Sequence, residues 1–152
     1  MAKFSTTISC IKSMVAAVKA SPVFALAVAA AFPGKTLLFW IGHDEKQKPP
    51  VSSAPYVALM PDNFGRNQER TQNDHGVLIA LVVADGSVDV VDGVTTYGGL
   101  EKVELLSRAF DAAISEWIKT NFAGIDGKTP FRTATELPAH KSVWSYTFPD
   151  QI

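Results

Sequence analysis

The chain has 152 residues, a length that fits one domain with a core large enough to fold without covalent cross-links. Its 14 lysines and arginines nearly balance 15 aspartates and glutamates, which argues against nonspecific binding of the monomer to nucleic acid. The single cysteine, Cys10, excludes an internal disulfide. We therefore treat residues 1–152 as a single domain.

Charge is distributed unevenly along the chain. Residues 1–42 carry four lysines and no acid, whereas residues 85–104 carry five acids and one lysine. Opposite patches of this kind can complement each other between copies of one protein in a ring. They are also typical of ordinary solvated surface, and the sequence leaves both interpretations open.

The N-terminal segment has a helical pattern. Hydroxyl side chains at residues 5–7 can cap a helix, and apolar residues then recur at steps of three and four, which predicts a helix over residues 6–20. Ser21 and Pro22 suit the start of a second, short helix, which Pro33 and Gly34 would end.

The second helix, at residues 22–32, resembles the apolar part of a signal peptide. Lys12 and Lys19 interrupt the approach to it, Pro22 breaks it, and it is far shorter than the roughly 20 residues of a membrane span. We expect a buried structural helix, with a cleaved signal of an exported protein as the alternative.

The middle of the chain alternates predicted strands and loops. Residues 36–41 and 55–61 are β-branched, aromatic or apolar runs bounded by glycine and proline, and both predict strands. The polar stretch 62–75 predicts a long exposed loop, either a contact arm or a loop with no specific role. Residues 77–84 form a continuous apolar run, which predicts a strand buried on both faces at the centre of the sheet.

The segment after this strand is acidic. Its aspartates at positions 85, 89 and 92 suggest a calcium loop, but their spacing misses the required pattern and no glutamate stands at position 12 of such a loop. We therefore predict turns and loops here.

The C-terminal half begins with the strongest helical signal in the chain. An apolar stripe from Val103 to Ile118 predicts a helix over residues 100–122 that covers one face of the sheet. Two strands are predicted at residues 131–137 and 142–148. In the last strand Trp144, Tyr146 and Phe148 point to one side, most simply into the core.

Sequence motifs for catalysis or cofactor binding are lacking. The three histidines lie next to predicted turns without a second metal ligand at a suitable spacing, and no phosphate-binding glycine loop is present. His43 with Asp44, or Asp74 with His75, could act as an acid–base couple, but no nucleophile motif accompanies them. We expect no enzyme activity, cofactor or metal, with a small hydrolase as the alternative.

These elements predict an α+β fold with a largely antiparallel sheet, covered on one face by the long helix, and with helices at the N-terminus. Three strands are apolar on both sides, so the second face also needs a cover. Either the N-terminal helices or a neighbouring subunit can supply it.

The order and length of these elements resemble those of the tail terminator, or tail completion, proteins of long-tailed bacteriophages. The resemblance covers most of the chain. It is carried by the N-terminal helix, the strand at 56–60, the long loop, the strand at 77–84, the helix at 103–120 and the last pair of strands with its aromatic end at 144–148.

The resemblance implies a hexameric ring that caps the tail tube, halts its polymerisation and joins it to the head–tail connector. Such a protein is made in the host cytoplasm, resides in the virion tail, binds no membrane and lets DNA pass without specific binding. Segments 62–75 and 85–99 would be its contact arms. The candidate assembly contacts are Asn63, Phe64, Arg66, Arg70, His75, Asp89, Asp92 and Tyr97. Another head–tail joining or minor tail protein and an exported binding domain remain alternatives.

Overall fold

The computed structural model describes residues 4–42, 49–62, 74–122, 124–125 and 127–149. The helical elements are α1 (Thr7–Ala20), α2 (Pro22–Ala31), the 3₁₀ turn η1 (Val51–Ser53) and α3 (Gly98–Asn121). The strands are β1 (Leu38–Ile41), β2 (Tyr56–Pro61), β3 (Asp74–Ala84), β4 (Val88–Val91), β5 (Val94–Tyr97), β6 (Gly127–Lys128), β7 (Arg132–Glu136) and β8 (Ala139–Pro149). The predicted α+β fold with a long helix is confirmed.

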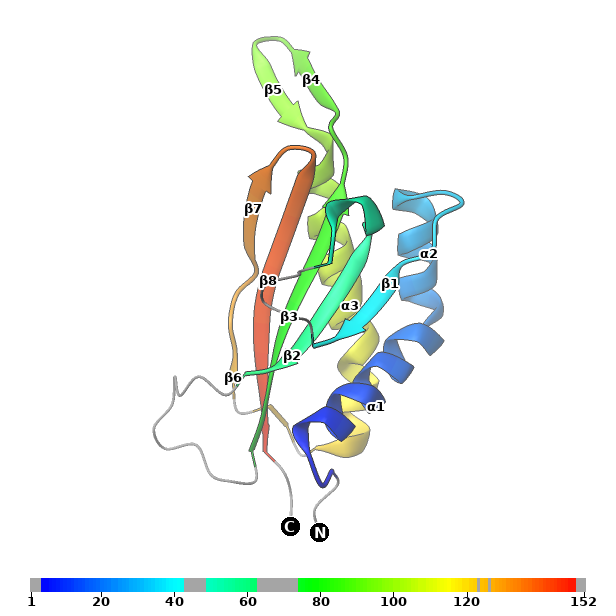
Figure 1. Cartoon of the computed structure of the whole chain (residues 1–152), viewed down its shortest axis with the longest axis vertical. Helices are drawn as coiled ribbons and strands as arrows, with labels where there is room; N and C mark the ends of the chain where they lie inside the picture. The colour runs from blue at the N-terminus through cyan, green and yellow to red at the C-terminus, as the bar shows by residue number, and fades with distance from the viewer. Residues whose placement is uncertain (1–3, 43–48, 63–73, 123, 126, 150–152) are drawn as a thin grey trace.

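One main sheet organises the molecule (Figure 1). Its strands run in the order β1-β2-β3-β8-β6, and β7 also pairs with β8. All pairs are antiparallel except β1 with β2. Ile79 in β3 lies opposite Leu59 on one side and Trp144 on the other, so the predicted central position of residues 77–84 is confirmed.

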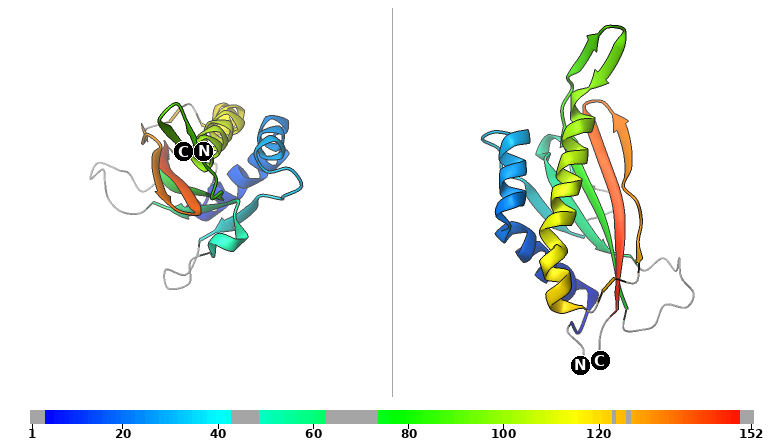
Figure 2. Two further views of the ribbon diagram at one scale, coloured as in Figure 1. Left: turned by 90° about the horizontal axis from the view of Figure 1, so that it is seen from above. Right: turned by 180° about the vertical axis from the view of Figure 1, so that it is seen from behind.

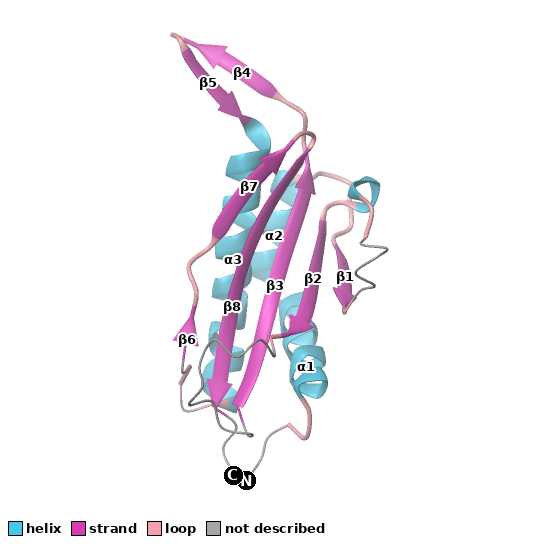
Figure 3. Cartoon of the chain, turned by 60° about the vertical axis from the view of Figure 1, so that its left-hand side comes forward, coloured by secondary structure: helices cyan, strands magenta, loops and turns pink. Residues whose placement is uncertain are grey.

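All three helices lie on the same face of this sheet (Figure 2). The long helix α3 runs along β3 and β8, while α1 and α2 lie beside it over β1 and β2. The N-terminal helices therefore do not supply the second layer, because they share a face with α3 (Figure 3).

The core fills the space between the sheet and the helices. Alternate residues of β3 and β8 point to the helical side, where Trp144, Tyr146 and Phe148 are at most 1% exposed. Phe110 of α3 meets Trp144 edge to face with ring centroids 5.5 Å apart. The aromatic side chains of the last strand thus form the core, as their period predicts.

The N-terminal helices begin where their caps predict. The Thr6 hydroxyl accepts a hydrogen bond from the Ser9 amide at 3.0 Å, and the Ser9 hydroxyl accepts one from the Thr6 amide at 3.2 Å. Ser21 caps α2 and Pro22 occupies its first turn. The helix is confirmed but its predicted burial is wrong, because only Phe24 and Val28 of α2 are buried and Leu26 is 71% exposed. The Trp117 indole donates to the Ser13 hydroxyl at 2.8 Å, which joins α3 to α1.

The second face of the sheet carries a smaller apolar cluster around Tyr56, Ala58 and Val82. At its β1 edge, Leu38 and Trp40 remain 42% and 38% exposed. The helices lie on the other face, yet Tyr56, Ala58 and Val82 are at most 7% exposed, so the β1 edge is the more exposed part of this face.

Segment 85–99 differs most from its prediction. Instead of a loop it forms a second, two-stranded sheet of β4 and β5, followed directly by α3 from Gly98. No single helix in the part of the chain that the structure describes is long and apolar enough to cross a membrane. By length and composition α1 and α2 pass that test together, but they are bent by 69° at Ser21.

Candidate assembly interface

The β4–β5 hairpin (Val88–Tyr97) projects beyond the end of the main sheet (Figure 1). Val91 lies opposite Val94, and Val88 lies opposite Tyr97. Asp92 and Gly93 form the two-residue turn with φ angles of 53° and 75°. Positive φ at both central positions is the type I′ turn, whose twist matches that of the flanking strands and which Asp-Gly favours.

Both faces of the hairpin carry exposed apolar side chains. Cross-strand neighbours share a face, so Val88 and Val90 lie with Tyr97 on one side, and Val91 lies with Val94 on the other. Val90, Val91 and Val94 are between 62% and 67% exposed. A hairpin with no layer packed on it is marginally stable in water, so this one is suited to gain its apolar contacts from a partner.

A fixed base holds the hairpin at the junction of β3, β8 and α3. His140 of β8 is fully buried, and its Nε2 lies 2.9 Å from the backbone oxygen of Asp85 while its Nδ1 lies 2.9 Å from the Thr135 hydroxyl. The Gly98 amide donates to the Ser87 carbonyl at 3.2 Å, so both arms of the hairpin are tied together where they leave the body.

Two glycines allow this close packing. A Cβ on Gly99 would overlap the ring of His140, and a Cβ on Gly98 would overlap the Ser87 hydroxyl. Glycine is therefore required here for space, because the first turn of α3 lies directly against the base of the hairpin.

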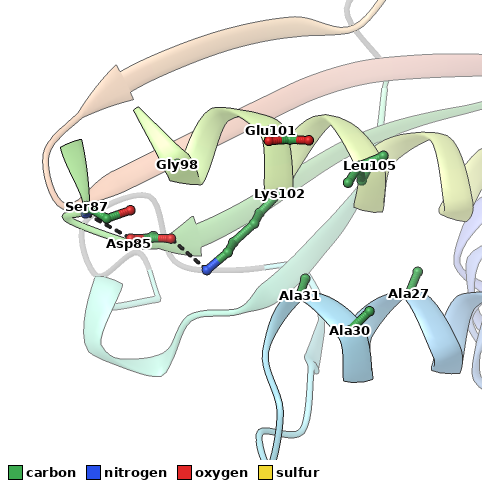
Figure 4. A pocket seen from close by; sticks show the side chains of 9 residues that line it. All are labelled: Ala27, Ala30, Ala31, Asp85, Ser87, Gly98, Glu101, Lys102 and Leu105. Carbon is green, nitrogen blue, oxygen red and sulfur yellow. Dashed lines mark hydrogen bonds and ion pairs between the residues drawn. The ribbon is translucent and has the colours of Figure 1, made fainter. Parts of the chain in front are cut away.

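Asp85 adds an electrostatic contact to the base (Figure 4). Its carboxylate lies 2.7 Å from the Lys102 ammonium of α3 and accepts a hydrogen bond from the Ser87 amide at 2.9 Å. The hydrogen bond with Lys102, followed by those with Ser87, lowers the pKa of Asp85 from its usual 3.8 to about 2. The carboxylate thus stays charged at neutral pH and links hairpin, strand and helix.

A groove beside this base runs between α2 and α3 (Figure 4). One wall is made of small residues of α2, Ala27, Ala30 and Ala31, and Leu105 of α3 lies opposite at 56% exposure. We call it the base groove. Two acids and one lysine line it, which gives it a charge of −1.

A second groove, which we call the lysine groove, lies between α2, the end of α1 and β1. The buried side chains of Phe24, Val28 and Leu37 form part of its lining. Lys19 and Lys35, both exposed, are its two charged residues, and the Lys19 ammonium lies 5.6 Å from the centre of the Phe39 ring. This groove is apolar with a charge of +2.

The structure brings three of the predicted contact residues together. Asp89, Asp92 and Tyr97 all belong to the hairpin and its turn. His75 is instead placed inside the subunit, at 5% exposure, within 3.0 Å of the Thr7 hydroxyl. It lies in β3, which is longer than the predicted strand, so His75 faces the core of the subunit. The candidates Asn63, Phe64, Arg66 and Arg70 lie outside the described residues.

The valines of the hairpin were missed by the sequence analysis. The signal for them was present, because an Asp-Gly pair flanked by alternating β-branched residues is a strong short-range predictor of a hairpin. In this chain the pair is Asp92-Gly93, and Val90, Val91 and Val94 flank it.

Of the residues proposed for a hydrolase, His75 is buried beside the Thr7 hydroxyl of α1, while His43 and Asp44 are outside the described residues. Among the residues that the structure describes, no group of three or more histidines, cysteines or acids is placed to hold a metal ion.

Comparison with known proteins adds no relative. No protein-family model matches the chain, and no curated protein matches its sequence.

Proposed function

We propose that this chain is a structural subunit of a bacteriophage tail, a tail terminator that assembles into a ring at the end of the tail tube. The ring stops tube polymerisation and provides the surface to which the head–tail connector binds. In this proposal the protein works by shape and assembly, and it breaks no bond in a substrate.

The observation that carries the proposal is the projecting hairpin. It exposes four valines on a fixed base, at the end of a subunit whose fold agrees with the order of elements on which the resemblance rests. A subunit that acted alone would leave this apolar surface in water without benefit, whereas an assembling subunit buries it against its neighbour.

The second face of the sheet supports the same conclusion. Leu38 and Trp40 are exposed at the β1 edge, and the helices that could have covered this face lie on the other side. Because Tyr56, Ala58 and Val82 on this face are at most 7% exposed within the single chain, the exposed β1 edge is the part of the face that a neighbouring subunit would cover.

The charge of the chain suits a channel for DNA. The net charge of the chain is −1. If acidic side chains line the lumen of the ring, repulsion of phosphate lets packaged DNA pass without binding. The partners proposed are therefore copies of this chain, the tail tube protein and the head–tail connector.

The test is to measure the native mass of the purified protein by sedimentation or native mass spectrometry, alone and with tail tube protein. We expect a hexamer, or an oligomer that grows with concentration, and tubes that stop elongating when the protein is added. A strict monomer that remains monomeric with tube protein would overturn the proposal.

An enzyme assay provides the contrasting outcome. Turnover of any substrate that is lost on changing His43 or His75 to alanine would favour the hydrolase. A mature N-terminus near Ala30 in the native source would favour the exported binding domain.

A further inference from the structure

We propose that the β4–β5 hairpin of one copy docks into the lysine groove of a second copy. The inference rests on the proposed function only in that copies of this chain associate, and it names the two surfaces that meet. The tail tube and the connector play no part in it.

Charge complementarity points to this pair of surfaces. The hairpin (Val88–Tyr97) carries Asp89 and Asp92 and no basic residue. The lysine groove carries Lys19 and Lys35 and no acid. Within the described residues, no ion pair joins any of these four side chains, so their charges are available to a second molecule.

The same criterion argues against the other two grooves. The base groove contains Asp85 and Glu101 beside Lys102, and a third groove between α1 and α3 contains Glu116 as its one charged residue. Each has a net charge of −1, so an acidic hairpin is repelled by both. Of these three grooves only the lysine groove is basic.

The arrangement of residues within the hairpin also fits. Asp89 and Val91 alternate along β4 and therefore share one face, on which Val94 lies opposite Val91. Asp92 follows directly in the turn. This face thus presents two adjacent valines beside Asp89, with Asp92 next to them in the turn, which suits an apolar groove lined by two lysines.

Apolar contact supplies the attraction, and charge selects the partner. Val91 and Val94 are 65% and 62% exposed, and burying such side chains stabilises an interface by about 25 cal/mol per Å². Ion pairs at the rim add little affinity but disfavour the wrong groove. The fixed hairpin base also reduces the conformational freedom that would be lost on docking.

Hairpin and groove are different surfaces of the same chain. A contact between two unlike surfaces is heterologous, and repeated from copy to copy it closes into a ring when the rotation allows. The predicted complementarity between the lysine-rich N-terminus and the acidic middle of the chain thereby becomes a contact between named residues.

Charge reversal tests the proposal. Asp89→Lys with Asp92→Lys, or Lys19→Glu with Lys35→Glu, is expected to weaken self-association about tenfold or more in sedimentation at low salt. All four changes in one chain restore opposite charges across the contact and are expected to restore association. Lys12→Glu with Lys141→Glu makes the same change of charge at exposed residues outside the lining of the groove and is the matched control.

A cross-link tests the geometry. Val91→Cys combined with Ala29→Cys in the groove is expected to give disulfide-linked oligomers under oxidising conditions. The matched control pairs Val91→Cys with Ala112→Cys, which lies in the third groove and should remain unlinked. The native Cys10 is fully buried and serves as an internal control.

The outcomes separate this inference from the proposed function. If the wild type associates but charge reversal does not weaken association and the cysteine pair does not cross-link, the hairpin contact is wrong and assembly of copies is still supported. If hairpin and groove cross-link but the protein does not affect tube growth, the contact is supported and the proposed tail function is wrong. A wild type that stays monomeric overturns both.

Discussion

The aromatic core beneath α3 and the hairpin beyond it are built from similar residues but differ in burial. Trp144 is 1% exposed and meets Phe110 and Phe131 edge to face, whereas Val90 and Val91 are about two thirds exposed. The difference shows that β-branched and aromatic residues form strands in both places, but only one has a layer packed on it. The hairpin is stabilised at its base and presents its apolar side chains outward.

The largest expected effect comes from truncation in the core. Trp144→Ala removes a fully buried ring that contacts two other aromatic side chains, and we expect a loss of about 3–5 kcal/mol in the free energy of unfolding. Urea denaturation followed by circular dichroism measures it. A loss below about 1 kcal/mol would mean that this core is not packed as described.

The hairpin base is expected to behave like the core, although it lies at the end of the molecule. Gly99→Ala places a methyl group against the ring of His140, which cannot withdraw without losing its hydrogen bonds to Thr135 and Asp85. We expect a destabilisation of about 1–3 kcal/mol in urea denaturation.

Gly124→Ala is the matched control for that substitution, because a Cβ there meets nothing within 4 Å. Its effect should stay within about 0.5 kcal/mol. If the two substitutions change the free energy of unfolding equally, the packing around His140 is not rigid. The hairpin would then have no fixed base.

The salt bridge at the base predicts a dependence on pH. The pKa of Asp85 is lower in the folded state, about 2, than the 3.8 of the unfolded chain, so the unfolded chain binds more protons between these values. The stabilisation is therefore present above about pH 4 and is lost as the pH falls toward 2.

We expect Asp85→Asn to lower the free energy of unfolding at pH 7 by about 1–2 kcal/mol, allowing for the solvent exposure of Lys102. Urea denaturation of the wild type and of the variant at pH 7 and at pH 2.5 measures the difference in their free energies of unfolding at each pH. This difference should be smaller at pH 2.5. If it is the same at both pH values, the ion pair is not its cause.

The sheet and α3 could be predicted because the spacing of their apolar residues follows the side on which the sheet and the helix pack against each other. The stripe from Val103 to Ile118 follows the helical period, and the continuous apolar run at 77–84 marks a strand in the middle of the sheet, whose residues on the helical side are fully buried. The side of the sheet taken by α1 and α2 could not be predicted, since strands that are apolar on both sides favour neither face.

The hairpin and its base were harder to predict for two physical reasons. The Asp-Gly pair predicts the turn, but valines on both faces of β4 and β5 give no contrast between inside and outside, so the sequence does not show that the hairpin stands clear of the main sheet. The base depends on His140 meeting the backbone of Asp85, 55 residues away, and no local pattern signals such a contact.

The smallest expected effect is also the most direct test of the contrast between the two regions. Val91→Thr keeps a β-branched shape on a strand that is 65% exposed at that position, so the free energy of unfolding should change by less than about 0.5 kcal/mol. The same substitution in the core, Val77→Thr, places a hydroxyl on a side chain with no exposed surface. It should cost about 1–3 kcal/mol, because the hydroxyl loses its hydrogen bonds to water.

Paired urea titrations of the two variants at low protein concentration, where copies do not associate, provide the measurement. At higher concentration Val91→Thr should weaken self-association although the subunit is as stable as the wild type, because the valine acts between copies and not within one. If Val91→Thr destabilises the isolated subunit as much as Val77→Thr does, the hairpin packs against its own chain and is not an arm held out for a neighbour.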